Sequence, residues 1–151
     1  MQPSVNEVSP YNRILFVVIA ILSLAGAAIS AVSLQRHYAK SSSDFCDFNQ
    51  QFNCDIVNRS EYSEWEGVPV AAIGVAGYAV LFLLSTLWKS RPQTPTRLLV
   101  AASVGLVFAL YLTYVEAHDL KTWCILCLAS QVLILLITLL SGMAKLQASR
   151  T

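Results

Sequence analysis

Four long runs of uncharged, mostly apolar residues constrain this chain more than any other feature. They cover residues 14–34, 68–88, 98–115 and 123–143. An α-helix rises about 1.5 Å per residue and the hydrocarbon core of a bilayer is about 30 Å thick, so each run can cross a membrane. Burial in a soluble core is the alternative, but a chain with only 13% charged residues has too little polar surface to cover four such helices. The sequence therefore predicts an all-α integral membrane protein, a four-transmembrane-helix bundle.

The segments around these runs define the expected domain organisation. We predict an N-terminal tail over residues 1–13, a membrane domain over 14–143 and a C-terminal tail over 144–151. The first run could instead be a cleaved signal peptide, but it is longer than the roughly 7–15 residues of a signal sequence's apolar core. A net charge of +1 argues against a nucleic-acid-binding protein.

Basic residues indicate which ends of the helices face the cytoplasm. Six of them lie near the termini or between the second and third runs: Arg13, Lys89, Arg91, Arg97, Lys145 and Arg150. The opposite side carries only four basic residues, which are Arg36, Lys40, Arg59 and Lys121. The same segments also contain eight acidic residues. By the positive-inside rule, both termini are cytoplasmic, and residues 35–67 and 116–122 face outward.

The four cysteines form two pairs on the same predicted side of the membrane. Cys46 and Cys54 lie in the long outer segment, and Cys124 and Cys127 open the fourth run as Cys-Ile-Leu-Cys. In an oxidising compartment such pairs form and exchange disulfides. A thiol in the first turn of a helix meets unsatisfied N–H groups and the positive end of the helix dipole, which favour the reactive thiolate. We therefore predict a dithiol relay.

Other interpretations of the cysteines remain open at this point. Two static disulfides would satisfy the same spacing. A zinc or iron–sulfur site of four thiolates is a weaker alternative, because one pair lies in a helix at the membrane and no histidine stands at ligand spacing; we expect no metal. The chain has no nucleotide-binding fingerprint or haem motif, so by elimination the electron acceptor of a relay is a quinone dissolved in the membrane.

Several motifs together resemble the vitamin K epoxide reductase family, and in particular its bacterial branch. They are the loop Cys-x7-Cys, the segment GVPVAAIGVAGY at 67–78, and YLTYVE at 111–116 followed by WCILC at 123–127. The resemblance spans residues 13 to 143. It implies a four-helix bundle in a bacterial inner membrane, with a quinone pocket near the outer face. It also implies the function of the quinone-linked disulfide-forming enzymes, supplied by a separate thioredoxin-like partner.

The resemblance also implies a role for each cysteine. Cys124 and Cys127 match the active pair, with Cys127 the thiol nearest the quinone. Cys54 matches the loop thiol that bonds to Cys124 during the relay, and Cys46 matches the thiol exposed to the partner. Leu-Ala-Ser-Gln at 128–131 replaces the Thr-Tyr-Ala of the animal enzymes, which argues against vitamin K epoxide as substrate. A quinone or epoxide reductase on the same fold, and a non-catalytic membrane protein with structural disulfides, remain the alternatives.

The remaining candidates are polar residues near the active pair. The expected quinone-binding residues are Ser63, Gln131, Tyr111 and Tyr114, and the expected proton acceptors are Glu116 and His118. Ser63 is the candidate that the resemblance implies. Helix packing and anchoring at the membrane interface are the alternative roles for the others. We expect His37 to be a solvated interface residue and Ser30 to serve close helix packing.

Overall fold

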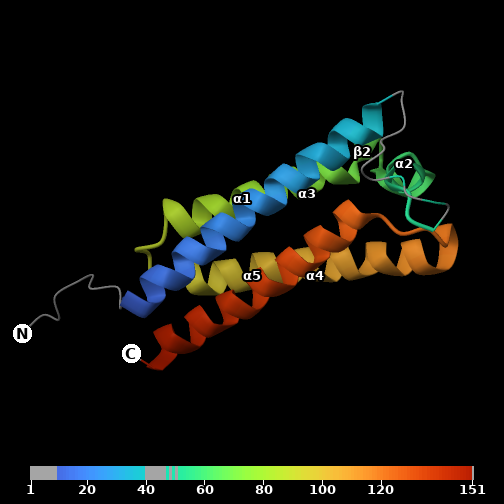
Figure 1. Cartoon of the computed structure of the whole chain (residues 1–151). Helices are drawn as coiled ribbons and strands as arrows, with labels where there is room; N and C mark the ends of the chain where they lie inside the picture. Colours follow the sequence, from blue (N-terminus) through green and yellow to red (C-terminus); the bar gives the residue numbers. More distant parts are fainter. Residues whose placement is uncertain (1–9, 40–46, 48, 50, 151) are drawn as a thin grey trace, which may run out of the picture.

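The computed structural model describes residues 10–39, 47, 49 and 51–150. Four long helices make up most of it (Figure 1): α1 (Pro10–Tyr38), α3 (Val70–Thr86), α4 (Thr94–Val115) and α5 (Ile125–Arg150). No proline interrupts the interior of any of them. Pro95 lies in the first turn of α4, where its missing N–H costs no hydrogen bond. The predicted mainly helical fold is confirmed.

Three of these helices are long and apolar enough to span a membrane, within the part of the chain that the structure describes. They are α1, α5 and the continuous helical segment Thr94–Leu120. The fourth, α3, is apolar but has only 17 residues, about 25 Å at the helical rise. The structure thus gives three clear spans and one shorter apolar helix, where the sequence predicted four spans.

The second run forms a shorter helix than predicted, because its first two residues are extended and Leu87 and Trp88 lie beyond the end of α3. Val68–Pro69 forms β2, which pairs antiparallel with β1 (Glu64–Trp65). The turn between them holds Glu66 and Gly67 at φ values of 53° and 83°. Two successive residues with positive φ suit a two-residue hairpin turn, which matches the right-handed twist of the paired strands. The sequence did not predict this hairpin, which adds two short strands to the mainly helical fold.

Several other boundaries also differ from those predicted from the sequence. Helix α1 covers Pro10–Tyr38 rather than residues 14–34, and so takes in the end of the expected N-terminal tail. The expected C-terminal tail at 144–151 continues α5 as far as Arg150. Beyond α4 the chain goes on as one turn of π-helix, η2 (Glu116–Leu120), which ends at Lys121 in the left-handed conformation with φ 50°. Short π segments are frequent at functional sites, because the wider turn redirects side chains.

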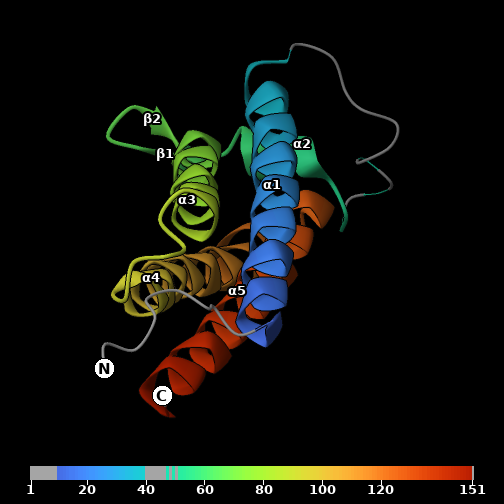
Figure 2. The ribbon, with the colours of Figure 1, turned by 90° about the vertical axis from the view of Figure 1, so that its left-hand side faces the viewer.

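The helices pack so that α1 contacts both α3 and α5, and α4 contacts α5. In Figure 1 the start of α1, the end of α5 and the α3–α4 connection lie at one end of the bundle. The short helix α2 (Cys54–Asn58) lies at the other end, and the η1 turn (Glu61–Ser63) and the hairpin follow it. Figure 2 shows the hairpin projecting beside α3. This antiparallel arrangement agrees with the order of crossings expected from the sequence.

Apolar side chains lie both inside and outside the bundle. Ile19, Leu98 and Ile137 are fully buried at its centre. Large apolar residues on the outer faces are more than half exposed, among them Ile21, Val107 and Leu139. Apolar residues on all faces of a helix are typical of a membrane-spanning helix, because lipid tails cover the side chains that point outward.

Candidate functional site

The outer segment is docked on the start of α5 by backbone hydrogen bonds. Phe52 and Trp123 form a parallel bridge. The N–H of Asn53 donates to the Trp123 carbonyl (3.1 Å), and the N–H of Trp123 donates to the Gln51 carbonyl (2.7 Å). This short ladder fixes the register of the two segments, so the residues that follow it, Cys54 and Cys124, lie side by side.

The two cysteines beyond the ladder belong to one buried cluster. Cys54 and Cys124 are both fully buried and pack together with Val57. Asn53 holds the first turn of α2 in place, since its side-chain oxygen accepts the N–H of Ile56 (3.1 Å). The fold therefore brings a thiol of the outer segment to a thiol of the helix pair.

The three described cysteines differ in redox state. Cys54 is disulfide-bonded, whereas Cys124 and Cys127 are free thiols. Cys46, the predicted contact with a redox partner, lies outside the described residues. In this state the helix pair holds two electrons that it can release by closing its own disulfide.

Cys124 acts as the capping residue of α5. Its carbonyl accepts the N–H of Leu128 (2.9 Å), and its Sγ accepts the N–H of Cys127 (3.4 Å). Cys124 precedes α5 and so lies outside the spanning helices. A hydrogen bond from the Cys127 thiol, helped by the backbone N–H groups at the start of the helix, lowers the pKa of Cys124 below that of an ordinary cysteine. The thiolate expected from the sequence is thus favoured at Cys124.

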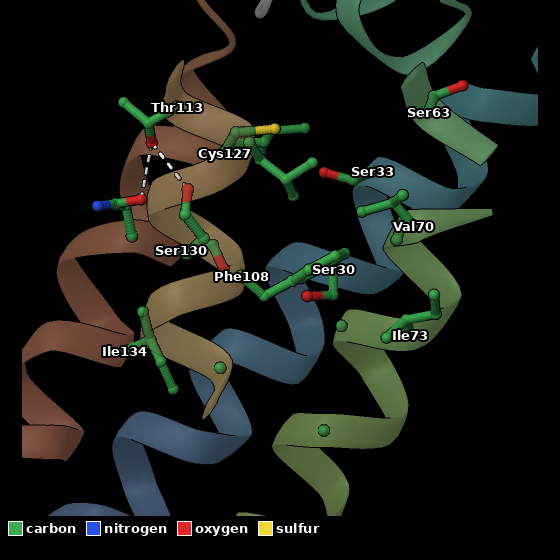
Figure 3. Close-up of a pocket in the computed structure, with 18 of the residues that line it drawn as sticks. Ser30, Ser33, Ser63, Val70, Ile73, Phe108, Thr113, Cys127, Ser130 and Ile134 are labelled. Carbon is green, nitrogen blue, oxygen red and sulfur yellow. Dashed lines mark hydrogen bonds between the residues drawn. The ribbon is translucent and has the colours of Figure 1, made fainter. Parts of the chain in front are cut away.

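Cys127 faces a cavity of about 390 Å³ that is lined mainly by the four long helices (Figure 3). The lining is mostly apolar and includes Val70, Ile73, Phe108 and Ile134. An apolar cavity of this size with a few convergent polar groups is typical of a small-molecule site. It has the volume and chemistry to hold a quinone ring, with a thiol in its wall.

Two of the four expected quinone-binding residues line this cavity. The Ser63 hydroxyl donates to the Ser60 carbonyl (2.6 Å), and the Gln131 side-chain oxygen accepts from the Thr113 hydroxyl (2.8 Å). Tyr111 and Tyr114 are absent from the lining and more than half exposed on α4. Their position near the outer end of the helix follows the sequence, but their face of the helix points away from the cavity.

The two expected proton acceptors are also separated. Glu116 is buried, lines the cavity, and accepts the backbone N–H of Cys124 (3.2 Å). His118 is exposed and stacks on Tyr114, with ring centroids 4.4 Å apart. His118, two residues after Glu116 on the π turn, therefore lies on the opposite side of the segment. Of the two residues, Glu116 is the one positioned to take a proton from the thiol pair.

His37 is not the solvated residue that the sequence suggested. Its side chain is only 10% exposed and lines the cavity. Nδ1 donates to the Asn58 carbonyl (2.5 Å), and Nε2 pairs with the Glu64 carboxylate (2.9 Å). These contacts tie the end of α1 to α2 and to the hairpin, and they depend on partners more than twenty residues away in the sequence.

Tyr78 is a further cavity residue that the sequence did not single out. Its ring crosses α1 at Gly26, where a Cβ atom would stand 2.2 Å from a ring carbon. Its hydroxyl donates to the Ser130 carbonyl and lies 2.8 Å from the Ser130 Oγ. Gly26 is therefore required for the close approach of α3, α1 and α5, and its place in an apolar run gave only a weak sign of this.

The four-thiolate metal site considered from the sequence includes Cys46, which lies outside the described residues. Over residues 10–39 and 51–150, with Asp47 and Asn49, no group of three histidine, cysteine or acidic side chains could hold a metal ion. The site consists of thiols, a buried carboxyl group and an apolar cavity.

The sequence matches that of a known family over residues 17–141, and the description of that family is the vitamin K epoxide reductase family. The match covers most of the chain and includes all four cysteines. At the level of the family it supports a membrane oxidoreductase linked to quinones or vitamin K. The buried thiol pair beside an apolar cavity is the geometry that such chemistry needs. This chain belongs to the vitamin K epoxide reductase family.

Proposed function

We propose that this chain passes electrons, two at a time, from a thioredoxin-like protein through two cysteine pairs to a membrane quinone. It would thereby support disulfide formation in exported proteins. Family membership supports the coarser part of the proposal, an integral membrane oxidoreductase. The path of the electrons and the identity of both partners are the proposal itself.

One observation carries the proposal: the thiols of the helix pair have different neighbours. Cys124 is packed against Cys54, while Cys127 lines the cavity. A pair placed in this way can exchange disulfides with the outer segment on one side and give electrons to a bound molecule on the other. A purely structural disulfide requires neither neighbour.

Each step of the proposed exchange breaks one disulfide and forms another. A partner dithiol reduces a Cys46–Cys54 disulfide and leaves oxidised. The freed Cys54 thiolate then attacks Cys124 of the closed helix pair, forming a Cys54–Cys124 bond and releasing the Cys127 thiol. Cys46 next attacks Cys54, which restores the outer disulfide and frees the Cys124 thiol. The described state, with Cys54 oxidised and the helix pair reduced, corresponds to the end of this exchange.

The helix pair then returns to the disulfide. A quinone supplies the acceptor, taking two electrons and two protons to become the quinol. Cys124, whose pKa is lowered by the Cys127 thiol, is the thiolate that closes the bond on Cys127 as the electrons leave. Glu116 lies against the pair and can accept the thiol proton during this step. Ser63 and Gln131 are the candidates among the expected residues to hydrogen-bond the bound ring.

The direction of the chain in the membrane follows the positive-inside rule. We place both termini in the cytoplasm and the cysteine pairs at the outer face of a bacterial inner membrane. A membrane-impermeant thiol reagent should then label Cys46 on intact cells after reduction. Labelling only after the cytoplasmic face is opened would contradict this orientation.

The test of the function is quinone reduction by the purified full chain. With dithiothreitol as electron donor and a short-chain ubiquinone as acceptor, we expect one quinol for each dithiol consumed. The reaction should require Cys124 and Cys127 but not Cys46. No quinol formation, together with a helix pair that stays locked as a disulfide in dithiothreitol, would favour a structural role; turnover of an epoxide in place of the quinone would favour the epoxide reductase.

A further inference from the structure

Two serines of α1 present hydroxyl groups to the cavity opposite Cys127. Ser30 and Ser33 lie one turn apart, are each only 6% exposed, and both line the cavity. Figure 3 shows both side chains pointing into the space between α1 and the helices that carry Phe108 and Cys127. In a lining that is otherwise largely apolar, they are a distinct polar feature.

Neither hydroxyl has a hydrogen-bond partner within the part of the chain that the structure describes. This is unusual for this bundle, where several hydroxyls donate to a carbonyl one turn earlier. Ser23 bonds to the Ile19 carbonyl (2.7 Å), and Thr138 bonds to the Ile134 carbonyl (2.7 Å). Unlike the enclosed Ser141 hydroxyl, the Ser30 and Ser33 hydroxyls remain accessible from the cavity. Two unpaired donors that open onto one apolar cavity point to a ligand with acceptor atoms.

Ser141 provides a useful contrast. Its hydroxyl is also unpaired among the described residues, but it is completely enclosed and does not line the cavity. No ligand can reach it. Ser30, by contrast, is accommodated by Gly74 on the facing helix, where a Cβ atom would stand 2.8 Å from the Ser30 Oγ. Gly74 leaves the Ser30 hydroxyl room beside the cavity.

We propose that Ser33 and Ser30 donate hydrogen bonds to two oxygen atoms of the ring that binds beside Cys127. Three helical residues advance by about 4.5 Å, so the two donors meet oxygens at separate positions of one ring rather than a single atom. Because a carbonyl oxygen only accepts, it requires donors of this kind. The pair selects a dioxygenated ring over a hydrocarbon one, and the identification of that ring as a quinone rests on the proposed function.

Alanine variants of the purified full chain test this inference, with Ser23→Ala as the matched control. Ser23 lies on the same helix but bonds to its own backbone and does not line the cavity. With dithiothreitol as donor, Ser33→Ala and Ser30→Ala should each raise the KM for a short-chain ubiquinone by about 5- to 10-fold, as expected for one lost hydrogen bond. The double variant should raise it further, with kcat within about twofold of the wild type.

A second readout does not depend on turnover. The same quinone should raise the Tm of the wild type and of Ser23→Ala, and this rise should be much smaller in the double variant. Without quinone, the Tm of the serine variants should equal or exceed that of the wild type, because the replaced hydroxyls have no partner to lose. A wild-type KM and Tm rise in the double variant would overturn the inference while leaving the proposed function intact. A wild type that neither reduces nor binds the quinone would instead overturn the proposed function, and this inference with it.

Discussion

The surroundings of Cys124 and Cys127 differ sharply, although the two residues are only three positions apart. Cys124 is enclosed by the docked outer segment and packs against Cys54 and Val57. Cys127 lies in the wall of a large apolar cavity. The surroundings of Cys124 are a tight intramolecular contact, whereas Cys127 borders a cavity suited to a small molecule.

One short motif can therefore serve two partners. The start of a helix places residue i before the first turn and residue i+3 within it, so the two thiols remain close enough to form a disulfide. The outer segment, which is hydrogen-bonded to the backbone at Trp123, covers Cys124. Cys127 faces the cavity inside the bundle instead. The following experiments probe each region separately.

Removing either thiol of the helix pair should have the largest effect. We expect Cys124→Ser and Cys127→Ser to abolish dithiothreitol-driven quinone reduction, because a single thiol cannot supply two electrons by closing a disulfide. Both variants should accumulate in the membrane near the wild-type level, since the short loop that they close contributes little stability. Disappearance of either variant from the membrane would favour a structural bond.

Glu116 should matter less than the thiols but more than any surface carboxylate. Replacing it by Gln keeps the shape and removes the proton acceptor beside the pair, so kcat should fall by about 100-fold. Asp119→Asn is the matched control, because Asp119 lies exposed on the same π turn. Equal rates in the two variants would remove Glu116 from the proton path.

The lowered pKa of Cys124 predicts a pH effect with a definite sign. Because the Cys127 thiol stabilises the Cys124 thiolate, that thiolate persists below the usual pH range of thiols and is lost as the pH falls through the lowered pKa. Cys127→Ala removes the donor and should move the ionisation of Cys124 to higher pH. Thiolate absorbance, measured with both loop cysteines replaced by alanine, reports the shift; an unchanged titration would contradict the assigned cause.

Weakening the contact between the outer segment and the start of α5 should have the smallest effect, and it should affect only the surroundings of Cys124. Asn53→Ala removes the cap of α2 and should cost about 1 kcal/mol of local stability. Turnover with a thioredoxin-like partner should fall about fivefold, while quinone reduction driven by dithiothreitol should be unchanged. Glu61→Ala, an exposed change in the same outer segment, serves as the control; equal losses in both assays would mean that the dock also shapes the cavity.

The sequence predicted the helical bundle because its apolar runs and charge distribution are dictated by the membrane. It did not predict the short α3, since Val68 and Pro69 are as apolar as the helix that follows, and only the neighbouring Glu66 and Gly67 indicate a turn. The order of the helices was predictable, and the exact lengths were not.

The site was predictable only in part, because helices that are apolar all round do not reveal which face points inward. Tyr111 lies at the expected depth but on the outer side, while Ser33 points into the cavity from a run that suggested only packing. His37 is buried by contacts with distant residues, which no local pattern encodes. The cysteines differ from these residues because their spacing and chemistry are recognisable without the fold.

The most direct test of the relay is disulfide mapping of the Cys127→Ala variant, prepared with its outer disulfide oxidised and kept free of reductant. Without Cys127, Cys124 cannot close its own bond. Its thiolate, which packs against Cys54, can then attack Cys54 in the outer disulfide, forming a Cys54–Cys124 bond and releasing the Cys46 thiol. Non-reducing peptide mapping should then recover a Cys54–Cys124 disulfide as the main species. Recovery of Cys124 only as a free thiol, with the outer disulfide unchanged, would contradict the transfer of electrons between the two pairs.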